Sequence, residues 1–304
     1  MTDINNTALT DLSDALAAAV EKAGNSTVLV SARRRIPASG IVWTADGAIL
    51  TSDHVIEREE EIKVIFADGR ELPATIAGRD PGSDLAVLKV QGSGFTAAER
   101  SPEGSARIGN IVLALGRPSP ESPMASLGVI SAIGGSWRTF RGTEVEGYIR
   151  SDTTFYPGFS GGPLIDAAGR VVGINSSRLG RGAGLTIPVA AAALVADDLL
   201  KQGRVRRAYL GVSSQGAKLP SALAARLDGQ DAGLLIVTVE ADSPADKAGI
   251  GIGDILVKFA GSPVTDTDSL QMLLGANRVG EATPVTVLRG GEPRDLTVTV
   301  GERS

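Results

Sequence analysis

Short apolar runs separated by tight turns fill the chain between Thr27 and Pro188. The runs are STVLVSA, SGIVWTADGAILTS, EIKVIFADGREL, DLAVLKV, IVLALG, LGVISAIG, VEGYIRSD and RVVGINS. The tripeptide ADG at 45–47 and 67–69 and AAG at 167–169 lie between such runs, as hairpin turns do. The 38 glycines in 304 residues exceed the typical ~7% and suit tight turns. The pattern predicts antiparallel strands in a barrel or sandwich, and its length allows two packed barrels.

A helix is predicted at each side of this strand-rich region. Residues 8–23 have Leu12, Leu16, Ala19 and Val20 on one helical face, which indicates an amphipathic helix. Residues 189–202 read as a closing helix, because a proline precedes them and a glycine follows them.

The last hundred residues begin a new pattern of strands and short helices. The strands LLIVTVE, DILVKFAG, TPVTVLRG and RDLTVTV alternate with helical stretches near 244–248 and 267–276. We therefore divide the chain into an N-terminal arm at 1–24, a mainly β domain at 25–203 and a small α+β domain at 204–304.

Composition removes several functional classes. The net charge is −5 with no basic block, so a nucleic-acid partner is not expected. No apolar run reaches the ~18 residues of a membrane span. The chain has no cysteine, which excludes disulfides and thiol catalysis. The first residues lack the basic and apolar regions of a signal peptide. We therefore expect a cytoplasmic protein, or a periplasmic or cell-envelope one if an export segment has been removed.

Three residues of the strand-rich region together have the chemistry of nucleophilic catalysis. His54, the single histidine, follows the run AILTS; Asp84 begins DLAVLKV; and Ser160 lies among glycines in PGFSGGP. Alone, each is more often structural: a surface histidine, a strand-end acid, a Gly/Ser loop. Together they supply a weak hydroxyl nucleophile, a base and an acid to orient that base. Their order, His, Asp, Ser, is that of the chymotrypsin type.

Collinear motifs from about residue 40 to 188 resemble the HtrA/Deg family of trypsin-like serine proteases. Residues 51–55 match T-N-x-H-V, and residues 80–89 match D-x-x-x-D-(L/I)-A-(V/L)-L-K. Residues 151–164 match T-D-A-x-I-N-x-G-N-S-G-G-(P/A)-L with departures, while 173–175 and 184–188 match G-I-N and G-F-A-I-P. The resemblance implies a chymotrypsin-like double β-barrel protease domain followed by a PDZ domain.

The resemblance also implies a role for each matched residue. Ser160 is expected to be the nucleophile, His54 the general base and then acid, and Asp84 the acid that orients His54, with Asp80 structural. The backbone N–H groups of Gly158 and Ser160 are expected to form the oxyanion hole. We expect Ser160 Oγ about 3 Å from the His54 ring, or farther when no substrate is bound, and the Gly158 N–H pointing into the site. No metal or cofactor is implied.

Two residues depart from the family pattern beside this site. Phe159 replaces the usual asparagine, and could bias the loop or cover part of the leaving-group side. Asp53 directly precedes His54, where the family has a small or neutral residue. We favour a solvated turn acid for Asp53 over a charge that raises the pKa of His54.

The substrate pocket of the family is formed by residues before the serine and by the 176–187 loop. The corresponding positions here are Thr154, Phe155, Gly184, Leu185 and Thr186. None is acidic, so we expect an apolar pocket for small aliphatic P1 side chains such as Val, Ala or Ile. Arg178 and Arg181 in that loop are either solvated charges or respond to an effector.

The last domain resembles a PDZ domain at its predicted peptide site. Tyr209, Leu210, Gly211 and Val212 match the loop that receives a C-terminal carboxylate, and the next strand would pair with the peptide. Leu270 and Leu273 lie on the predicted groove helix, although such apolar residues are also common in a core.

These features lead to a hypothesis and an alternative. The first is a serine endopeptidase acting on unfolded or misfolded proteins in quality control or processing, with exposed C-termini captured by the PDZ domain. The alternative is a weakly active or inactive protease-fold chaperone or binding protein, which Phe159 and Asp53 motivate. A third possibility is a resting protease activated by peptides at the PDZ domain. The resemblance further implies a homotrimer.

Overall fold

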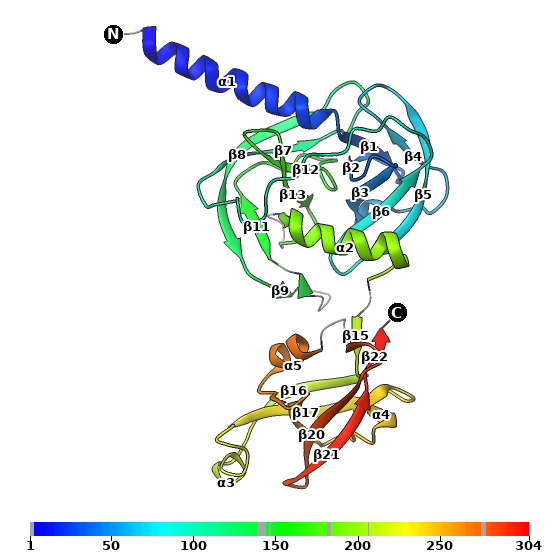
Figure 1. The fold of residues 1–304 in the computed structure, drawn as a ribbon, viewed down its shortest axis with the longest axis vertical. Helices are drawn as coiled ribbons and strands as arrows, with labels where there is room; N and C mark the ends of the chain where they lie inside the picture. Colours follow the sequence, from blue (N-terminus) through cyan, green and yellow to red (C-terminus); the bar gives the residue numbers. More distant parts are fainter. Residues whose placement is uncertain are drawn as a thin grey trace. The chain divides into compact units, whose positions relative to one another are not determined.

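The chain folds into two compact units, residues 1–205 and 206–304. The structure, a computed structural model, describes residues 3–138, 144–145, 147–180, 184–205, 207–274 and 278–303. The first unit carries both barrels and two long helices, and the second is a smaller sheet with short helices (Figure 1).

Six antiparallel strands close the first barrel in the order β1-β2-β3-β6-β5-β4. They are β1 (Thr27–Ser31), β2 (Ala38–Val42), β3 (Ala48–Ser52), β4 (Ile62–Ile65), β5 (Glu71–Asp80) and β6 (Leu85–Val90). Val28, Ile49 and Leu88 belong to the apolar cluster of this barrel. Ser52, the last residue of β3, pairs with Leu85, the first of β6. The segments after β3 and before β6 therefore meet at one rim.

The second barrel also has six antiparallel strands, in the order β11-β14-β13-β12-β7-β8. They are β7 (Ile111–Gly116), β8 (Met124–Gly134), β11 (Tyr148–Ser151), β12 (Pro163–Asp166), β13 (Val171–Ser176) and β14 (Leu185–Pro188). A two-stranded sheet joins β9 (Trp137–Arg138) to β10 (Glu144–Val145). The predicted double β-barrel is confirmed.

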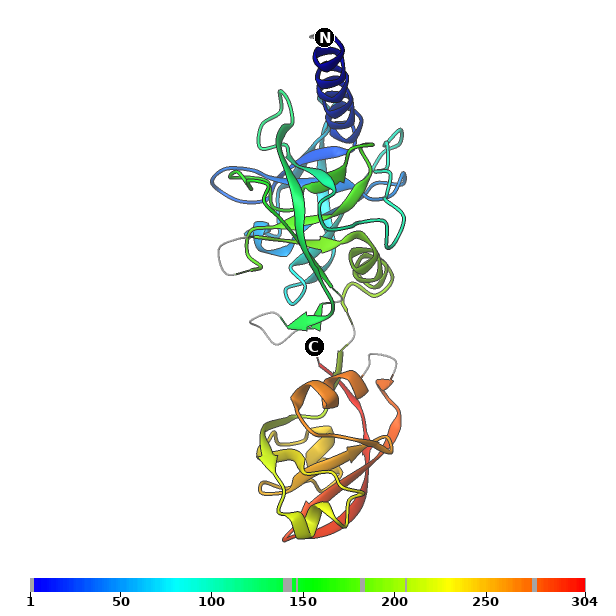
Figure 2. The same cartoon turned by 90° about the vertical axis from the view of Figure 1, so that its left-hand side faces the viewer.

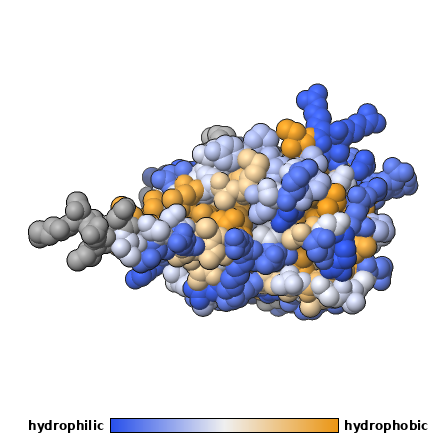
Figure 3. All heavy atoms as spheres, turned by 90° about the horizontal axis from the view of Figure 1, so that it is seen from above, coloured by the Kyte–Doolittle hydropathy of each residue, from blue (hydrophilic) through white to orange (hydrophobic). Residues whose placement is uncertain are grey.

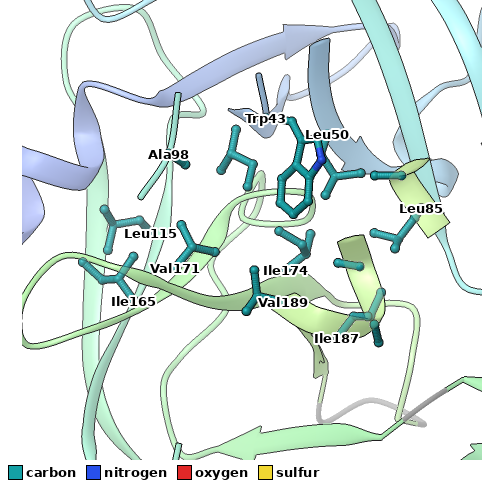
Figure 4. Packing of buried hydrophobic residues seen from close by; sticks show 14 of the residues in the cluster. Trp43, Leu50, Leu85, Ala98, Leu115, Ile165, Val171, Ile174, Ile187 and Val189 are labelled. Atoms are coloured by element: carbon teal, nitrogen blue, oxygen red, sulfur yellow. The ribbon is translucent and has the colours of Figure 1, made fainter. Parts of the chain in front are cut away.

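The barrels share an apolar core. Trp43, Leu50 and Leu85 of the first barrel form one buried cluster with residues of the second (Figure 4). The labelled residues from the second barrel are Leu115, Ile165, Val171, Ile174 and Ile187. Helix α2 (Val189–Gln202) covers this core and packs on β5 and β6 of one barrel and on β13 and β14 of the other. The predicted closing helix therefore joins the two barrels.

Helix α1 (Asp3–Gly24) begins five residues earlier than the predicted 8–23. Its Ala19 and Ala23 are buried against the barrels, whereas Leu9 and Leu12 are 67% and 44% exposed. The helix extends outward from the barrels (Figure 2), and Figure 3 shows apolar surface among hydrophilic residues on the face seen from above. Within the described residues, no helix is both long and apolar enough to cross a membrane.

The second unit is a twisted antiparallel sheet with the order β16-β17-β18-β20-β21, and β19 pairs with β18. The strands are β16 (Val212–Lys218), β17 (Ala232–Val239), β18 (Ile255–Phe259), β19 (Ser262–Pro263), β20 (Ala282–Arg289) and β21 (Glu292–Thr299), with β15 (Arg207–Tyr209) paired to β22 (Gly301–Arg303). Its helices are α3 (Ser221–Ala224), α4 (Pro244–Lys247) and α5 (Thr267–Leu273). The sheet edge at β16 lies beside α5.

Candidate active site

His54 and Asp84 form a hydrogen-bonded pair at the rim where β3 and β6 meet. His54 lies in a single 3₁₀ turn (η1, Asp53–Val55) directly after β3, and Asp84 directly precedes β6. The ring Nδ1 lies 2.8 and 2.9 Å from the two carboxylate oxygens of Asp84. Carboxylate oxygens accept hydrogen bonds, so the His54 Nδ1–H donates to Asp84. The pair therefore fixes the orientation of the His54 ring.

Asp84 is fixed on every side. It is 1% exposed and has a left-handed φ of 60°, a conformation that aspartate and asparagine tolerate better than other side chains. Its Oδ1 also accepts the backbone N–H of His54 at 3.1 Å. Its Oδ2 accepts the hydroxyl of Ser176, the last residue of β13, at 2.5 Å. No local motif in the sequence marks Ser176 as a partner of Asp84, because the contact joins segments of different barrels.

Two backbone donors of the turn that carries Ser160 have no partner among the described residues. The N–H groups of Phe159, Gly161 and Gly162 donate to the carbonyls of Tyr156, Asn175 and Phe159, at 3.0, 2.8 and 2.9 Å. Over the described part of the chain, the N–H groups of Gly158 and Ser160 donate to no protein atom. The unpaired N–H groups are the predicted oxyanion donors.

Glycine is required at both ends of this turn. Gly158 has a φ of 93°, and a Cβ there would lie 2.7 Å from Pro118 Cβ. Gly161 has a φ of 84°, and a Cβ there would lie 2.2 Å from the Ser39 carbonyl oxygen and 2.9 Å from the Ser52 nitrogen. Gly161 thus packs on the end of β3, two residues before His54, and brings the serine turn beside the histidine.

The hydroxyl of Ser160 is hydrogen-bonded to Ser177 rather than to His54. Ser160 Oγ lies 2.8 Å from Ser177 Oγ and accepts the Ser177 N–H at 3.2 Å. Among the described hydrogen bonds, none joins Ser160 to His54, in contrast to the expected contact. The structure therefore shows the three residues assembled at one place with the serine side chain turned to Ser177.

The interpretation of Asp53 as a solvated turn acid is wrong. Asp53 is 4% exposed, and its Oδ1 accepts Arg79 Nε at 2.7 Å. Arg79 Nη2 also donates to the backbone carbonyls of Asp53 and Ile56, at 3.3 and 3.2 Å. Arg79 thus neutralises Asp53 and ties the His54 turn to β5.

Phe159 points into the protein interior. Its side chain is 0% exposed and packs in the second barrel with Ile130, Leu164 and Val172. Its ring meets Tyr156 edge to face, with centroids 5.4 Å apart. It is therefore a core residue, and it does not cover the leaving-group side.

The predicted substrate-pocket residues separate into two groups. Phe155 packs on Gly184, where an added Cβ would lie 2.6 Å from the phenyl ring, and Thr154 is exposed. Leu185 is 5% exposed in the core between the barrels, and Thr186 donates its hydroxyl to Asn175 at 2.9 Å. Arg178 is exposed, and Arg181 lies outside the described residues. Phe155 is half-buried and Gly184 is buried, so Thr154 is the one exposed residue of these five.

The predicted peptide-binding residues of the second unit surround the start of β16. The carbonyls of Leu210 and Gly211 accept the N–H groups of Ala245 and Glu240, both at 2.8 Å, which fixes the loop. Tyr209 donates its hydroxyl to Glu240, and Val212 begins the edge strand. On α5, Leu270 is 4% exposed in the core and Leu273 packs against it, so Leu270 is mainly structural.

Comparisons with known proteins agree with this architecture. The family model of the trypsin-like peptidase domain matches residues 38–174, and the PDZ domain model matches residues 208–300. A protein of Ectopseudomonas mendocina (strain ymp) named "Probable periplasmic serine endoprotease DegP-like" is 36% identical over 268 residues, which are 86% of this chain and 56% of that protein. A protein of the same name from Halomonas elongata is 36% identical over 277 residues, 90% of this chain and 58% of that protein. The chain thus spans little more than half the length of these relatives.

Solved structures match over nearly the whole chain. The serine endoprotease from Yersinia pestis is 30% identical with a TM-score of 0.78, over 95% of this chain and 98% of that one. The HtrA-type protease AlgW with a tripeptide is 32% identical with a TM-score of 0.76, over 95% of this chain and 97% of that one. This chain belongs to the HtrA-type family of trypsin-like serine proteases that carry a PDZ domain.

Proposed function

We propose that the protein is a serine endopeptidase in which Ser160 attacks the peptide carbonyl. His54 takes the Ser160 proton and delivers it to the leaving amine, while Asp84 holds the ring and stabilises the imidazolium. The N–H groups of Gly158 and Ser160 stabilise the oxyanion of the tetrahedral intermediate. One observation carries the proposal: a turn with two N–H groups that have no partner in the described part of the chain lies beside an oriented His–Asp pair.

Digestion of unfolded casein by the purified chain tests this proposal. We expect fragments to accumulate equally with and without EDTA, and pretreatment with a serine-directed fluorophosphonate to stop the digestion. Intact casein after long incubation with the untreated protein would contradict the proposal.

The weakly active binding protein is the less favoured alternative. Phe159 lies in the core and Asp53 is paired with Arg79, so neither motivates inactivity any longer. The relatives are named endoproteases.

The Ser160–Ser177 hydrogen bond supports a resting state from which the serine must turn. Ser177→Ala removes the bond between the two hydroxyls and keeps the one from the Ser177 N–H. The loss of one hydrogen bond of about 1 kcal/mol corresponds to a roughly fivefold faster turn of the serine. We therefore expect Ser177→Ala to raise the rate at which a fluorophosphonate labels Ser160 by about that factor. Ser177→Thr, which keeps a hydroxyl, should return the rate to that of the wild type. An unchanged or slower rate in Ser177→Ala would contradict this interpretation.

For the PDZ unit, we propose capture of exposed C-termini at the loop of Tyr209 to Val212, with the peptide paired to β16 beside α5. A solved HtrA-type relative was determined with a decapeptide. The free carboxylate would be bound by backbone N–H groups. Peptides with apolar C-termini should raise the rate of casein digestion, and the same peptides with a C-terminal amide should not. Equal effects of the acid and amide forms would contradict carboxylate capture.

Assembly and location extend the proposal. We propose a homo-oligomer, a trimer by family resemblance, and sedimentation equilibrium tests it. The relatives are named as periplasmic, which supports the periplasm or cell envelope over the expected cytoplasm. Natural substrates in either place would be unfolded proteins, and the lack of an acidic side chain among Thr154, Phe155, Gly184, Leu185 and Thr186 supports small aliphatic P1 side chains.

A further inference from the structure

Ser39 of β2 makes direct hydrogen bonds to two carbonyls of the Ser160 turn. The residue is 0% exposed. Its hydroxyl donates to the Gly158 carbonyl at 2.7 Å, and its backbone N–H donates to the Ser160 carbonyl at 3.2 Å. Ser39 belongs to the first barrel, whereas the turn lies between β11 and β12 of the second. One serine therefore links the turn to the opposite barrel.

These bonds hold the peptide units on both sides of the Ser160 N–H. The Gly158 carbonyl belongs to the peptide unit that joins Gly158 to Phe159. The Ser160 carbonyl belongs to the peptide unit that joins Ser160 to Gly161. Between them, the Phe159 carbonyl accepts the Gly162 N–H at 2.9 Å. In a planar trans peptide the N–H points opposite to the C=O. The Ser160 N–H therefore points away from the Gly162 N–H. A rotation of either peptide unit held by Ser39 would change the direction of the Ser160 N–H.

The direction of the Ser39 hydroxyl proton is set by Arg117. The backbone N–H of Arg117 donates to Ser39 Oγ at 2.8 Å, which occupies a lone pair and leaves the hydroxyl proton for Gly158. The Arg117 side chain is 3% exposed, and burial lowers its pKa. It donates to the carbonyls of Thr27 at 2.8 Å and Gly24 at 3.0 Å. Arg117 is thus anchored where α1 ends and β1 begins.

We propose that Ser39 is a positioning residue that holds the N–H group of Ser160 in the orientation needed to bind an oxyanion. The inference rests on the proposed endopeptidase activity. Ser39 orients the turn through the two carbonyls and does not itself contact the substrate. The plain alternative is a buried serine that contributes to stability alone.

The two roles predict different kinetics for Ser39→Ala. Loss of orientation affects binding of the transition state, so kcat should fall about 10²-fold, near the loss of one oxyanion donor, with KM within about twofold of wild type. The affinity for a peptide boronate, which forms a tetrahedral adduct with the nucleophile, should fall by the same factor as kcat/KM. A structural role would lower the thermal midpoint and leave kcat per folded molecule unchanged.

The matched control is Ser101→Ala, which removes another buried serine hydroxyl, bonded to Asp166 at 3.0 Å in the second barrel. It should lose stability and keep its kcat. If Ser39→Ala does not fold, Ser39→Cys is the second variant, because its thiol is similar in size to the hydroxyl and a weaker donor. It should also lower kcat, by less than Ser39→Ala would.

A folded Ser39 variant whose kcat and boronate affinity match the wild type would overturn the positioning role, while casein digestion by the wild type would still stand. An inactive wild type would instead overturn the proposed function itself.

Discussion

Ser160→Ala is expected to lower kcat for peptide hydrolysis by about 10⁶-fold, because the nucleophile is lost and only binding and the oxyanion donors remain. The fold should persist, since the Ser160 side chain bonds only to Ser177 among the described residues. The measurement is kcat on a peptide substrate at saturation, with circular dichroism to verify folding.

Two further variants make the Ser160 result specific. Because the nucleophile and base act as a unit, adding His54→Ala to Ser160→Ala should cause little further loss. Ser221→Ala, an exposed serine at the start of α3, should keep the wild-type rate. A Ser160→Ala variant within tenfold of wild type would remove Ser160 from the reaction.

Asp84→Asn is expected to lower kcat by about 10⁴-fold, because the amide favours the wrong tautomer of His54. The shape and the left-handed φ of 60° suit asparagine, so the backbone should be kept. An amide NH₂ would face at least one of three donors, which are the His54 backbone N–H, the His54 ring and the Ser176 hydroxyl. Steady-state kinetics with a folding control measures the effect.

Asp166→Asn is the matched control for that substitution. Asp166 also accepts backbone N–H groups, a serine hydroxyl and a side-chain cation, Arg170, but it lies at the end of β12. It should lose stability and little kcat. Equal losses of kcat in the two variants would show that the Asp84 effect is not specific to His54.

The fold and the three candidate catalytic residues could be predicted from the sequence because their signals are local. Strand-length apolar runs and turn residues predicted a barrel or sandwich, and the family resemblance implied two barrels. His54, Asp84 and Ser160 lie within short motifs. The helix at 189–202 was also predictable, since a proline precedes it and a glycine follows it. Helix α3, with four residues, is too short to give a periodic signal.

The remainder depends on pairings between distant strands. Ser39 meets the Ser160 turn, and Ser176 meets Asp84, only after both barrels close and pack together. Arg79 neutralises Asp53 across the first barrel, which no spacing in the sequence indicates. The inward direction of Phe159 likewise follows from the turn geometry. Long-range packing therefore determines whether each neighbour of His54, Asp84 and Ser160 is exposed, paired or buried.

The most direct test of the central claim is the site and stoichiometry of fluorophosphonate labelling under conditions in which casein is digested. We expect one probe per chain, mapped to Ser160 by peptide mass spectrometry, with labelling abolished in Ser160→Ala and strongly slowed in His54→Ala. Labelling at another residue, or digestion that continues with Ser160 unlabelled, would contradict it.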